Sequence, residues 1–258
     1  MTGAIVLRQA TAVLGVLCIL TTHACGRDHR PLRVSAAASL ADVLPPVARA
    51  WRRRGGPEVA FNFDATPRLA RQIRAGAPSD VVVSADVEWV DTLEHEGLVL
   101  ERSRRRLLGN ELVTVVPAAR AGAMPRSAGD LAAPRFARIA IAGPNVPAGR
   151  YAHAALRSAG ALDRLAPRFI EADSVRSALA WAARAEVDAA IVYRTDALAE
   201  RRVTLAFTFP ESSHPPIVYE AAVVRRSAEP EAAADFIELC ASDETRGIFE
   251  RAGFRVLR

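Results

Sequence analysis

Short apolar runs alternate with amphipathic segments along nearly the whole chain after residue 31. Apolar runs of this length predict buried strands, and apolar positions that recur every three or four residues predict helices. Regular alternation of the two is typical of βαβ units and therefore of an α/β fold with largely parallel sheets. The predicted strands are residues 32–38, 59–63, 80–83, 112–116, 139–142, 189–193 and 217–224, and the predicted helices are residues 41–51, 67–75, 87–96, 149–159, 175–185, 230–240 and 243–251.

Two predicted strands, residues 112–116 and 217–224, interrupt this alternation because no helix follows them promptly and prolines flank them. We interpret them as crossover strands that link two α/β lobes. The first lobe then comprises residues 31–112 plus 218–258, and the second comprises residues 113–217. A cleft between two such lobes is a natural place for a ligand.

Four positions mark helix starts that follow strands, namely Ser39, Thr66, Ala148 and Val175, and Tyr193 ends a further strand. Helix N-termini present unpaired N–H groups and the positive end of the helix dipole to an anion. Open α/β sheets bind ligands at the carboxyl ends of their strands. Taken singly, each position is as well or better explained as an ordinary helix start or a core tyrosine. Together they favour a protein that holds an oxyanion.

Local details of the first two helix starts can also be predicted. Ser39 with Asp42 three residues later has the pattern of a capping box. Thr66 followed by Pro67 predicts a cap with proline at the first helical position. In both cases the hydroxyl is expected to bond to its own helix, unless a ligand uses it.

The 258-residue chain has a net charge of +5 and a pI near 9.8, which by itself would suit a nucleic-acid binder. However, the chain contains no lysine, and its arginines are spread over several predicted helices. No basic stripe interleaved with aromatic residues occurs. The sequence therefore argues against nucleic acid as a partner.

The first 25 residues have the features of an export signal, with Arg8 preceding the apolar residues 10–20. This apolar run is too short to span a bilayer comfortably. Cleavage after Ala24 would release a soluble protein, whereas acylation of Cys25 would leave a lipid anchor. Cys25 has no evident disulfide partner, which slightly favours the anchor. Both routes predict a periplasmic or otherwise extracytoplasmic protein.

An exported serine hydrolase is the alternative from another functional class. Ser39, Asp86 and His214 are the residue types of a catalytic triad, but the chain has no G-x-S-x-G motif. Its five histidines show no metal-ligand spacing, and it lacks phosphate-loop and dinucleotide-binding motifs. The sequence therefore predicts no catalytic residues, no metal cation and no cofactor.

Several segments, spread from residue 35 to residue 214, together resemble the periplasmic molybdate-binding proteins, which are substrate-binding components of ABC importers for molybdate and tungstate. The resemblance implies a two-lobed type II periplasmic-binding fold with two crossover hinge strands and a ligand cleft between the lobes. It also implies a monomer whose partners are the oxyanion and the transmembrane subunits of an ABC permease. The segments are residues 35–40, 69–73, 76–81, 84–86, 108–110, 146–152, 191–193 and 209–214.

The same resemblance implies that Ser39, Thr66, Ala148, Val175 and Tyr193 bind the anion. The hydroxyl groups of the first, second and last of these would donate, together with backbone N–H groups at the helix starts. Another anion on the same fold, such as sulfate or phosphate, is the alternative ligand.

The loop before Thr66 departs from the family pattern of small residues and serines, because Asp64 places a carboxylate near the proposed dianion. Either this carboxylate points away from the ligand, or it alters affinity or selectivity. The departure leaves the identity of the ligand more open than the fold.

Overall fold

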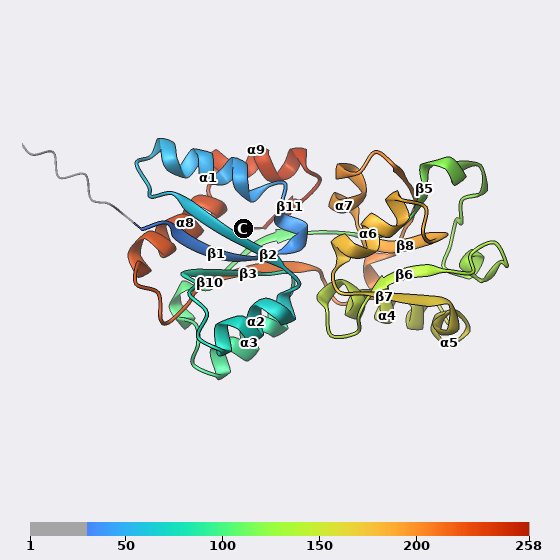
Figure 1. Ribbon diagram of the computed structural model, residues 1–258, viewed down its shortest axis with the longest axis horizontal. Coiled ribbons are helices and arrows are strands. Elements are labelled where there is room, and N and C mark those ends of the chain that lie inside the picture. Colours follow the sequence, from blue (N-terminus) through green and yellow to red (C-terminus); the bar gives the residue numbers. More distant parts are fainter. Residues whose placement is uncertain (1–29, 258) are drawn as a thin grey trace, which may run out of the picture.

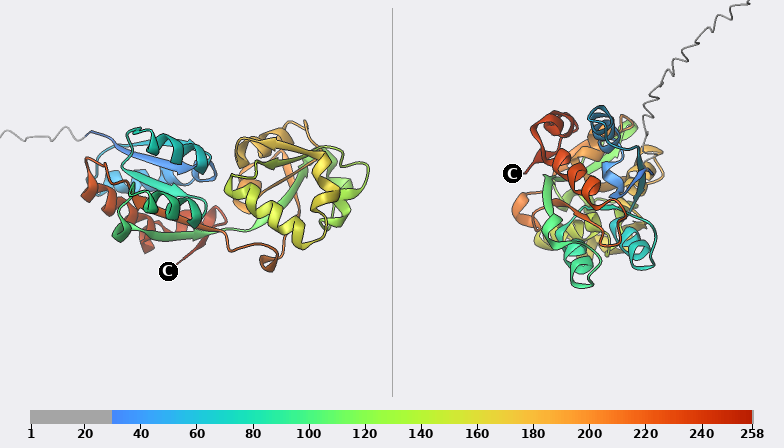
Figure 2. Two further views of the ribbon diagram at one scale, coloured as in Figure 1. Left: turned by 90° about the horizontal axis from the view of Figure 1, so that it is seen from below. Right: turned by 90° about the vertical axis from the view of Figure 1, so that its left-hand side faces the viewer.

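The structure is a computed structural model that describes residues 30–257, whose strands form two separate sheets (Figure 1). Helices cover both faces of each sheet, so that each sheet is the centre of an α/β lobe. The two lobes lie side by side along the long axis of the molecule and are joined by two chain segments (Figure 2). The predicted two-lobed α/β fold is thereby confirmed.

The first lobe combines residues from both ends of the described chain. Its strands are β1 (Leu32–Ala37), β2 (Val59–Asp64), β3 (Val81–Ser84), β4 (Arg105–Gly109), β10 (Val218–Val223) and β11 (Arg255–Val256). Its helices are α1 (Leu44–Arg53), α2 (Thr66–Arg74), α3 (Val87–His95), α8 (Pro230–Ala241) and α9 (Asp243–Arg251). The strand order is β11-β4-β10-β3-β1-β2, in which β1 is parallel to β2 and β3.

Strand β3 shows why this sheet needs helices on both of its faces. Its three valines are all buried, and successive side chains of a strand point to opposite faces. Val82 packs with α2 and α3, whereas Val81 and Val83 belong to the core that includes α1, α8 and α9. The valines at residues 81–83 are thus buried on both faces, which is typical of a strand near the centre of a sheet.

The second lobe is formed by the middle of the chain. Its strands are β5 (Leu112–Pro117), β6 (Ile139–Ala142), β7 (Phe169–Ala172), β8 (Ala189–Tyr193) and β9 (Val203–Thr208), in the order β7-β6-β8-β5-β9. Its helices are α4 (Pro147–Ser158), α5 (Leu162–Leu165), α6 (Val175–Ala183) and α7 (Arg194–Ala199). Helices α6 and α7 cover one face of the sheet, and α4 and α5 cover the other (Figure 1).

The chain passes between the lobes at two short segments, residues 110–111 and residues 209–217. The expectation that strands 112–116 and 217–224 themselves cross between the lobes needs correction. Strand β5 lies wholly within the second sheet, and β10 lies wholly within the first. Both strands are almost wholly buried and have paired neighbours on both sides, so they are interior strands of a sheet.

The start of the first helix also differs from the prediction. Ser39 lies in the 3-10 helix η1 (Ala38–Leu40), and α1 begins only at Leu44. Pro45 and Pro46 fit the first turn of α1, because an N–H group there has no intrahelical partner to lose. Ser39 makes no capping bond and Asp42 pairs with an arginine of the second lobe, so the predicted capping box is wrong.

The predicted export signal, residues 1–25 with Cys25, lies outside the described residues. Within residues 30–257, no helix is long and apolar enough to cross a membrane. Helices α4 and α8 have only 12 residues each, against the roughly 20 that a membrane-spanning helix needs.

Candidate functional site

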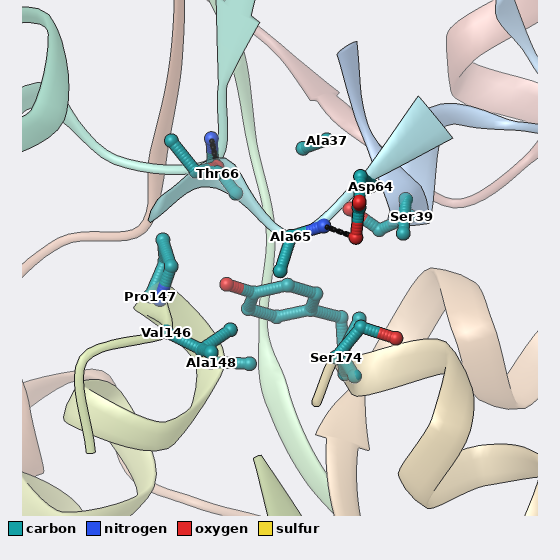
Figure 3. A pocket seen from close by; sticks show the side chains of 13 residues that line it. Ala37, Ser39, Asp64, Ala65, Thr66, Val146, Pro147, Ala148 and Ser174 are labelled. Carbon is teal, nitrogen blue, oxygen red and sulfur yellow. Dashed lines mark hydrogen bonds between the residues drawn. The ribbon is translucent and has the colours of Figure 1, made fainter. Parts of the chain in front are cut away.

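A small cavity lies where the two lobes face each other. Ser39, Asp64 and Thr66 lie on the first-lobe side of the cavity, and Ala148 and Ser174 lie on the second-lobe side (Figure 3). The lining residues lie at the carboxyl ends of β1, β2, β3, β6, β7 and β8 or just after them. This is the edge at which α/β sheets generally bind ligands.

All five residues that the sequence singled out line this one cavity. The structure thus brings together positions that are up to 154 residues apart, from Ser39 to Tyr193. Their role as anion ligands stays a prediction, since proximity alone does not define a ligand. Ser39 lies in η1, Thr66 is the first residue of α2, Ala148 is the second residue of α4, Val175 is the first residue of α6, and Tyr193 is the last residue of β8.

The Tyr193 hydroxyl has the most informative environment in the cavity. The residue is only 1% exposed, and its oxygen has no hydrogen-bond partner among the described residues. Burial raises the pKa of Tyr193 well above its usual value, so the phenol keeps its proton. Because an unpaired buried hydroxyl is costly, a proton donor in this position indicates a place for an acceptor.

The Thr66 hydroxyl presents its proton to the cavity for a different reason. Its oxygen accepts the backbone N–H of Ala85 at 3.3 Å. A hydroxyl that already accepts a bond still has one proton to donate. The residue that precedes α2 is Ala65, and Thr66 makes no capping bond, so the predicted Thr66 cap is wrong and its hydroxyl remains available.

Helices α4 and α6 direct their N-termini toward the cavity from the second lobe. Ala148 and Val175 lie in the first turns of these helices, where N–H groups have no intrahelical partner. The hydroxyl of Ser174 accepts the N–H of Ser177 at 3.1 Å and thereby caps the start of α6. This cap pairs the third N–H group of α6, and it does not use the N–H groups of Val175 and Arg176 that precede it.

Gly149 allows α4 to approach the end of β6 closely. A Cβ atom at this position would lie 2.1 Å from the carbonyl oxygen of Gly143 and 2.2 Å from that of Ala142. Real Cβ atoms do not approach backbone oxygens this closely, so any other residue would push the helix away from the sheet. The glycine therefore sets the position of the neighbouring Ala148 at the cavity.

Asp64 is the one charged side chain among the described residues that line the cavity. Its Oδ1 atom accepts the N–H of Ala65 at 2.7 Å (Figure 3) and also lies 3.2 Å from Nη1 of Arg68. Arg68 extends across the cleft to Asp173, with its Nη2 atom 3.1 Å from Oδ2. The Asp64 carboxylate is thus held at the edge of the site and is partly balanced by an arginine.

Two arginines of the second lobe also form ion pairs across the cleft, in each case with carboxylates of the first lobe. Arg150 pairs with Asp86 and Glu88, and Arg176 lies 2.6 Å from Asp42. Burial raises the pKa of Asp86, and the nearby Arg150 opposes that shift. These pairs, like that of Arg68, connect the two lobes around the cavity without lining it.

The structure does not support the hypothetical hydrolase triad. Ser39 bonds to Tyr219 at 2.8 Å, Asp86 pairs with Arg150, and Nδ1 of His214 lies 2.8 Å from its neighbouring backbone oxygen. No hydrogen bond joins any two of the three residues within the described chain. Residues 30–257 also contain no cluster of histidine, cysteine and carboxylate side chains that could hold a metal ion.

The sequence analysis missed two buried residues behind the cavity, Tyr219 and Asn110. Tyr219 lies near the start of β10, and its pairing with Ser39 spans 180 positions of the chain. Asn110 occupies the first crossing between the lobes, and the sequence points to it only through the family resemblance of residues 108–110. Apart from that resemblance, a polar residue at a lobe crossing is the one sequence signal that points to Asn110.

The structure has two α/β lobes, two chain crossings between them and a cavity lined by donors where they meet. This arrangement defines a solute-binding protein of the periplasmic-binding class. The chain belongs to this class: the family model for bacterial extracellular solute-binding proteins matches residues 32–255.

Two curated relatives cover most of the chain. The molybdate-binding protein ModA of Escherichia coli is 36% identical over 89% of this chain and 90% of its own length. The molybdate-binding protein ModA of Haemophilus influenzae is 34% identical, with coverage of 86% and 88%. Among solved structures, the periplasmic molybdate-binding protein of Azotobacter vinelandii superimposes with a TM-score of 0.81 at 26% identity. That match covers 88% of this chain and 100% of the other.

Proposed function

We propose that this chain is the substrate-binding component of an ABC importer and captures molybdate or tungstate in the cleft between its lobes. The buried hydroxyl of Tyr193 is the observation that carries the proposal, because within residues 30–257 this donor has no acceptor. The names of the curated relatives support molybdate as the ligand.

The chemistry of the cavity suits a fully deprotonated oxyanion. Such an ion has only acceptor atoms, so each contact from the protein has to be a donor. The hydroxyls of Thr66 and Tyr193 and the first turns of α4 and α6 provide neutral donors. Each helix N-terminus adds about 0.3–1 kcal/mol of favourable interaction with a negative charge, and up to about 2 kcal/mol when partly buried.

Capture takes place outside the cytoplasm, as in other extracellular solute-binding proteins. In this proposal the predicted export signal is removed by cleavage after Ala24, and Cys25 becomes the lipid-bearing N-terminus. The loaded monomer then delivers its ligand to the transmembrane subunits of the permease. Binding and release complete its task, so we expect no turnover of substrate, no cofactor and no bound metal cation.

Calorimetric titration of the mature protein with molybdate, tungstate, sulfate and phosphate tests the ligand directly. Molybdate and tungstate should bind, and each should raise the melting temperature by mass action. Sulfate at the same concentration should do much less, because the donors of both lobes are held at fixed separations. Equal effects of all four anions would contradict size selection, and no effect of any would contradict the function.

Acylation of Cys25 requires a separate measurement. Mass spectrometry of the protein purified from bacterial membranes should show an N-terminal lipid, and Cys25→Ala should move the protein to the soluble fraction. An unmodified N-terminus at Cys25 would instead show ordinary cleavage after Ala24 and a soluble protein.

A further inference from the structure

A buried chain of hydrogen bonds leads from the crossing between the lobes to the ligand cavity. The Nδ2 atom of Asn110 lies 2.9 Å from the hydroxyl of Thr195 and 3.3 Å from that of Tyr219. The Tyr219 hydroxyl lies 2.8 Å from Oγ of Ser39, which lines the cavity. All four residues are at most 5% exposed, so water does not readily replace any of these bonds.

The direction of this chain follows from the amide of Asn110. Its Oδ1 atom accepts the backbone N–H of Glu111 at 2.9 Å, which fixes the amide so that Nδ2 faces Tyr219 and Thr195. An amide nitrogen can only donate. The oxygen of Tyr219 therefore accepts the bond from Asn110.

The proton of Tyr219 then has a single place to go. Burial raises the pKa of Tyr219, so the phenol stays protonated. Ser39 Oγ is the remaining hydrogen-bond partner of this hydroxyl within the described chain. If Tyr219 did not donate to Ser39, a fully buried O–H group would be left unpaired, which is costly. Ser39 thus accepts from Tyr219, and its own proton is free for the cavity.

We propose that Tyr219, held by Asn110, is a positioning residue that sets Ser39 as a hydrogen-bond donor toward the bound oxyanion. This inference rests on the proposed anion-binding function. Its physical basis is preorganisation, because a hydroxyl that is already turned toward the ligand loses less rotational freedom on binding. Without Tyr219, the Ser39 hydroxyl could still reach the ligand but would have to be ordered by it.

A double-mutant cycle on molybdate affinity tests this role. Tyr219→Phe should weaken binding about 2- to 12-fold, the equivalent of one ordinary hydrogen bond. Ser39→Ala should weaken it more, because it removes the donor itself. In the Ser39→Ala background, Tyr219→Phe should have no further effect on affinity, since Tyr219 acts only through Ser39. A purely structural role of Tyr219 would instead weaken binding equally in both backgrounds.

Asn110→Asp provides a second variant with the same side-chain shape. An ionised carboxylate at this position accepts rather than donates, so Tyr219 would turn its proton toward residue 110 and Ser39 would donate to Tyr219. Affinity should then fall further than in Tyr219→Phe. The same substitution in the Ser39→Ala background measures the effect of the added charge alone, and the loss there should be smaller.

Thr195→Val is the matched control, because it removes the partner of the other hydrogen of the same amide. Its affinity should equal that of the parent, although its melting temperature should be lower. Additive effects in the cycle, or parental affinity of Tyr219→Phe, would overturn the inference. If the parent binds another oxyanion but not molybdate, the proposed function fails and the cycle is measured with that anion. If the parent binds none of the four anions, both proposals fail.

Discussion

Tyr193→Phe is expected to change affinity and stability in different directions. The substitution removes one oxygen that is buried, lines the cavity and has no partner among the described residues. The aromatic ring, which packs edge-on against Tyr219 with centroids 6.0 Å apart, is retained. The ligand-free protein therefore loses only an unsatisfied polar group, whereas the liganded protein loses a donor.

The magnitudes follow from the cost of each group. A hydrogen bond to a charged acceptor contributes about 1.5–3 kcal/mol, so affinity should fall about 10- to 150-fold. A buried unpaired polar group costs about 1–3 kcal/mol. Each 1 kcal/mol corresponds to about 2–4 °C in melting temperature for a protein of this size. The ligand-free variant should thus melt about 2–12 °C above the parent.

Calorimetry with molybdate and a melting curve without ligand measure the two effects independently. Tyr151→Phe is the control, because Tyr151 is also largely buried, at 7% exposure, but does not line the cavity. Its affinity should match that of the parent. Parental affinity of Tyr193→Phe together with a lower melting temperature would show that Tyr193 is an ordinary core tyrosine, and the donor argument would fail.

Three further substitutions probe the charge and packing around the cavity. Asp64→Asn should tighten molybdate binding in calorimetry by about 1 kcal/mol, which is about fivefold. Asp173→Asn is the control and should not tighten binding, because the Asp173 side chain is 78% exposed and lies outside the cavity. Gly149→Ala should abolish binding and lower the melting temperature by several degrees, because its Cβ atom would lie 2.1 Å from a backbone oxygen. Burial raises the pKa of Asp196 from 3.8 to about 6 although Arg176 opposes it, so the folded state holds this proton more tightly than the unfolded state. The contribution of this group to the free energy of unfolding, about 3 kcal/mol, is therefore complete below about pH 4 and is lost as the pH rises through about 6. Urea unfolding at a series of pH values should show this loss in the parent and not in Asp196→Asn.

The candidate ligands could be located from sequence because their positions depend on chain order. Thr66, Ala148 and Val175 come at or near the first residue of helices that follow predicted strands. In parallel βαβ units such positions meet at one edge of a sheet, whatever the details of packing. Two lobes that face each other then bring two such edges together at one cavity.

Contacts between distant segments could not be found in the same way. The local pattern at Ser39 predicted a cap, but its hydroxyl bonds to Tyr219, which lies 180 positions away. A tertiary partner that is already in place competes with the local bond, and sequence spacing contains no trace of it. The pairing of Asp64 with Arg68 was also out of reach, because Asp64 is the last residue of β2 and Arg68 lies in the first turn of α2, so the helical i,i+4 rule does not apply to them.

The distribution of charge around the cavity separates closure of the lobes from recognition of the ligand. The described arginines that connect the lobes, Arg68, Arg150 and Arg176, pair with carboxylates and do not line the cavity. A cation inside the site would attract any anion of suitable charge, since Coulomb attraction depends only weakly on direction. Hydroxyl and N–H donors depend strongly on distance and angle, so they favour one size of oxyanion over another. Ion pairs outside the cavity can hold the lobes together, while neutral donors inside it discriminate between ligands.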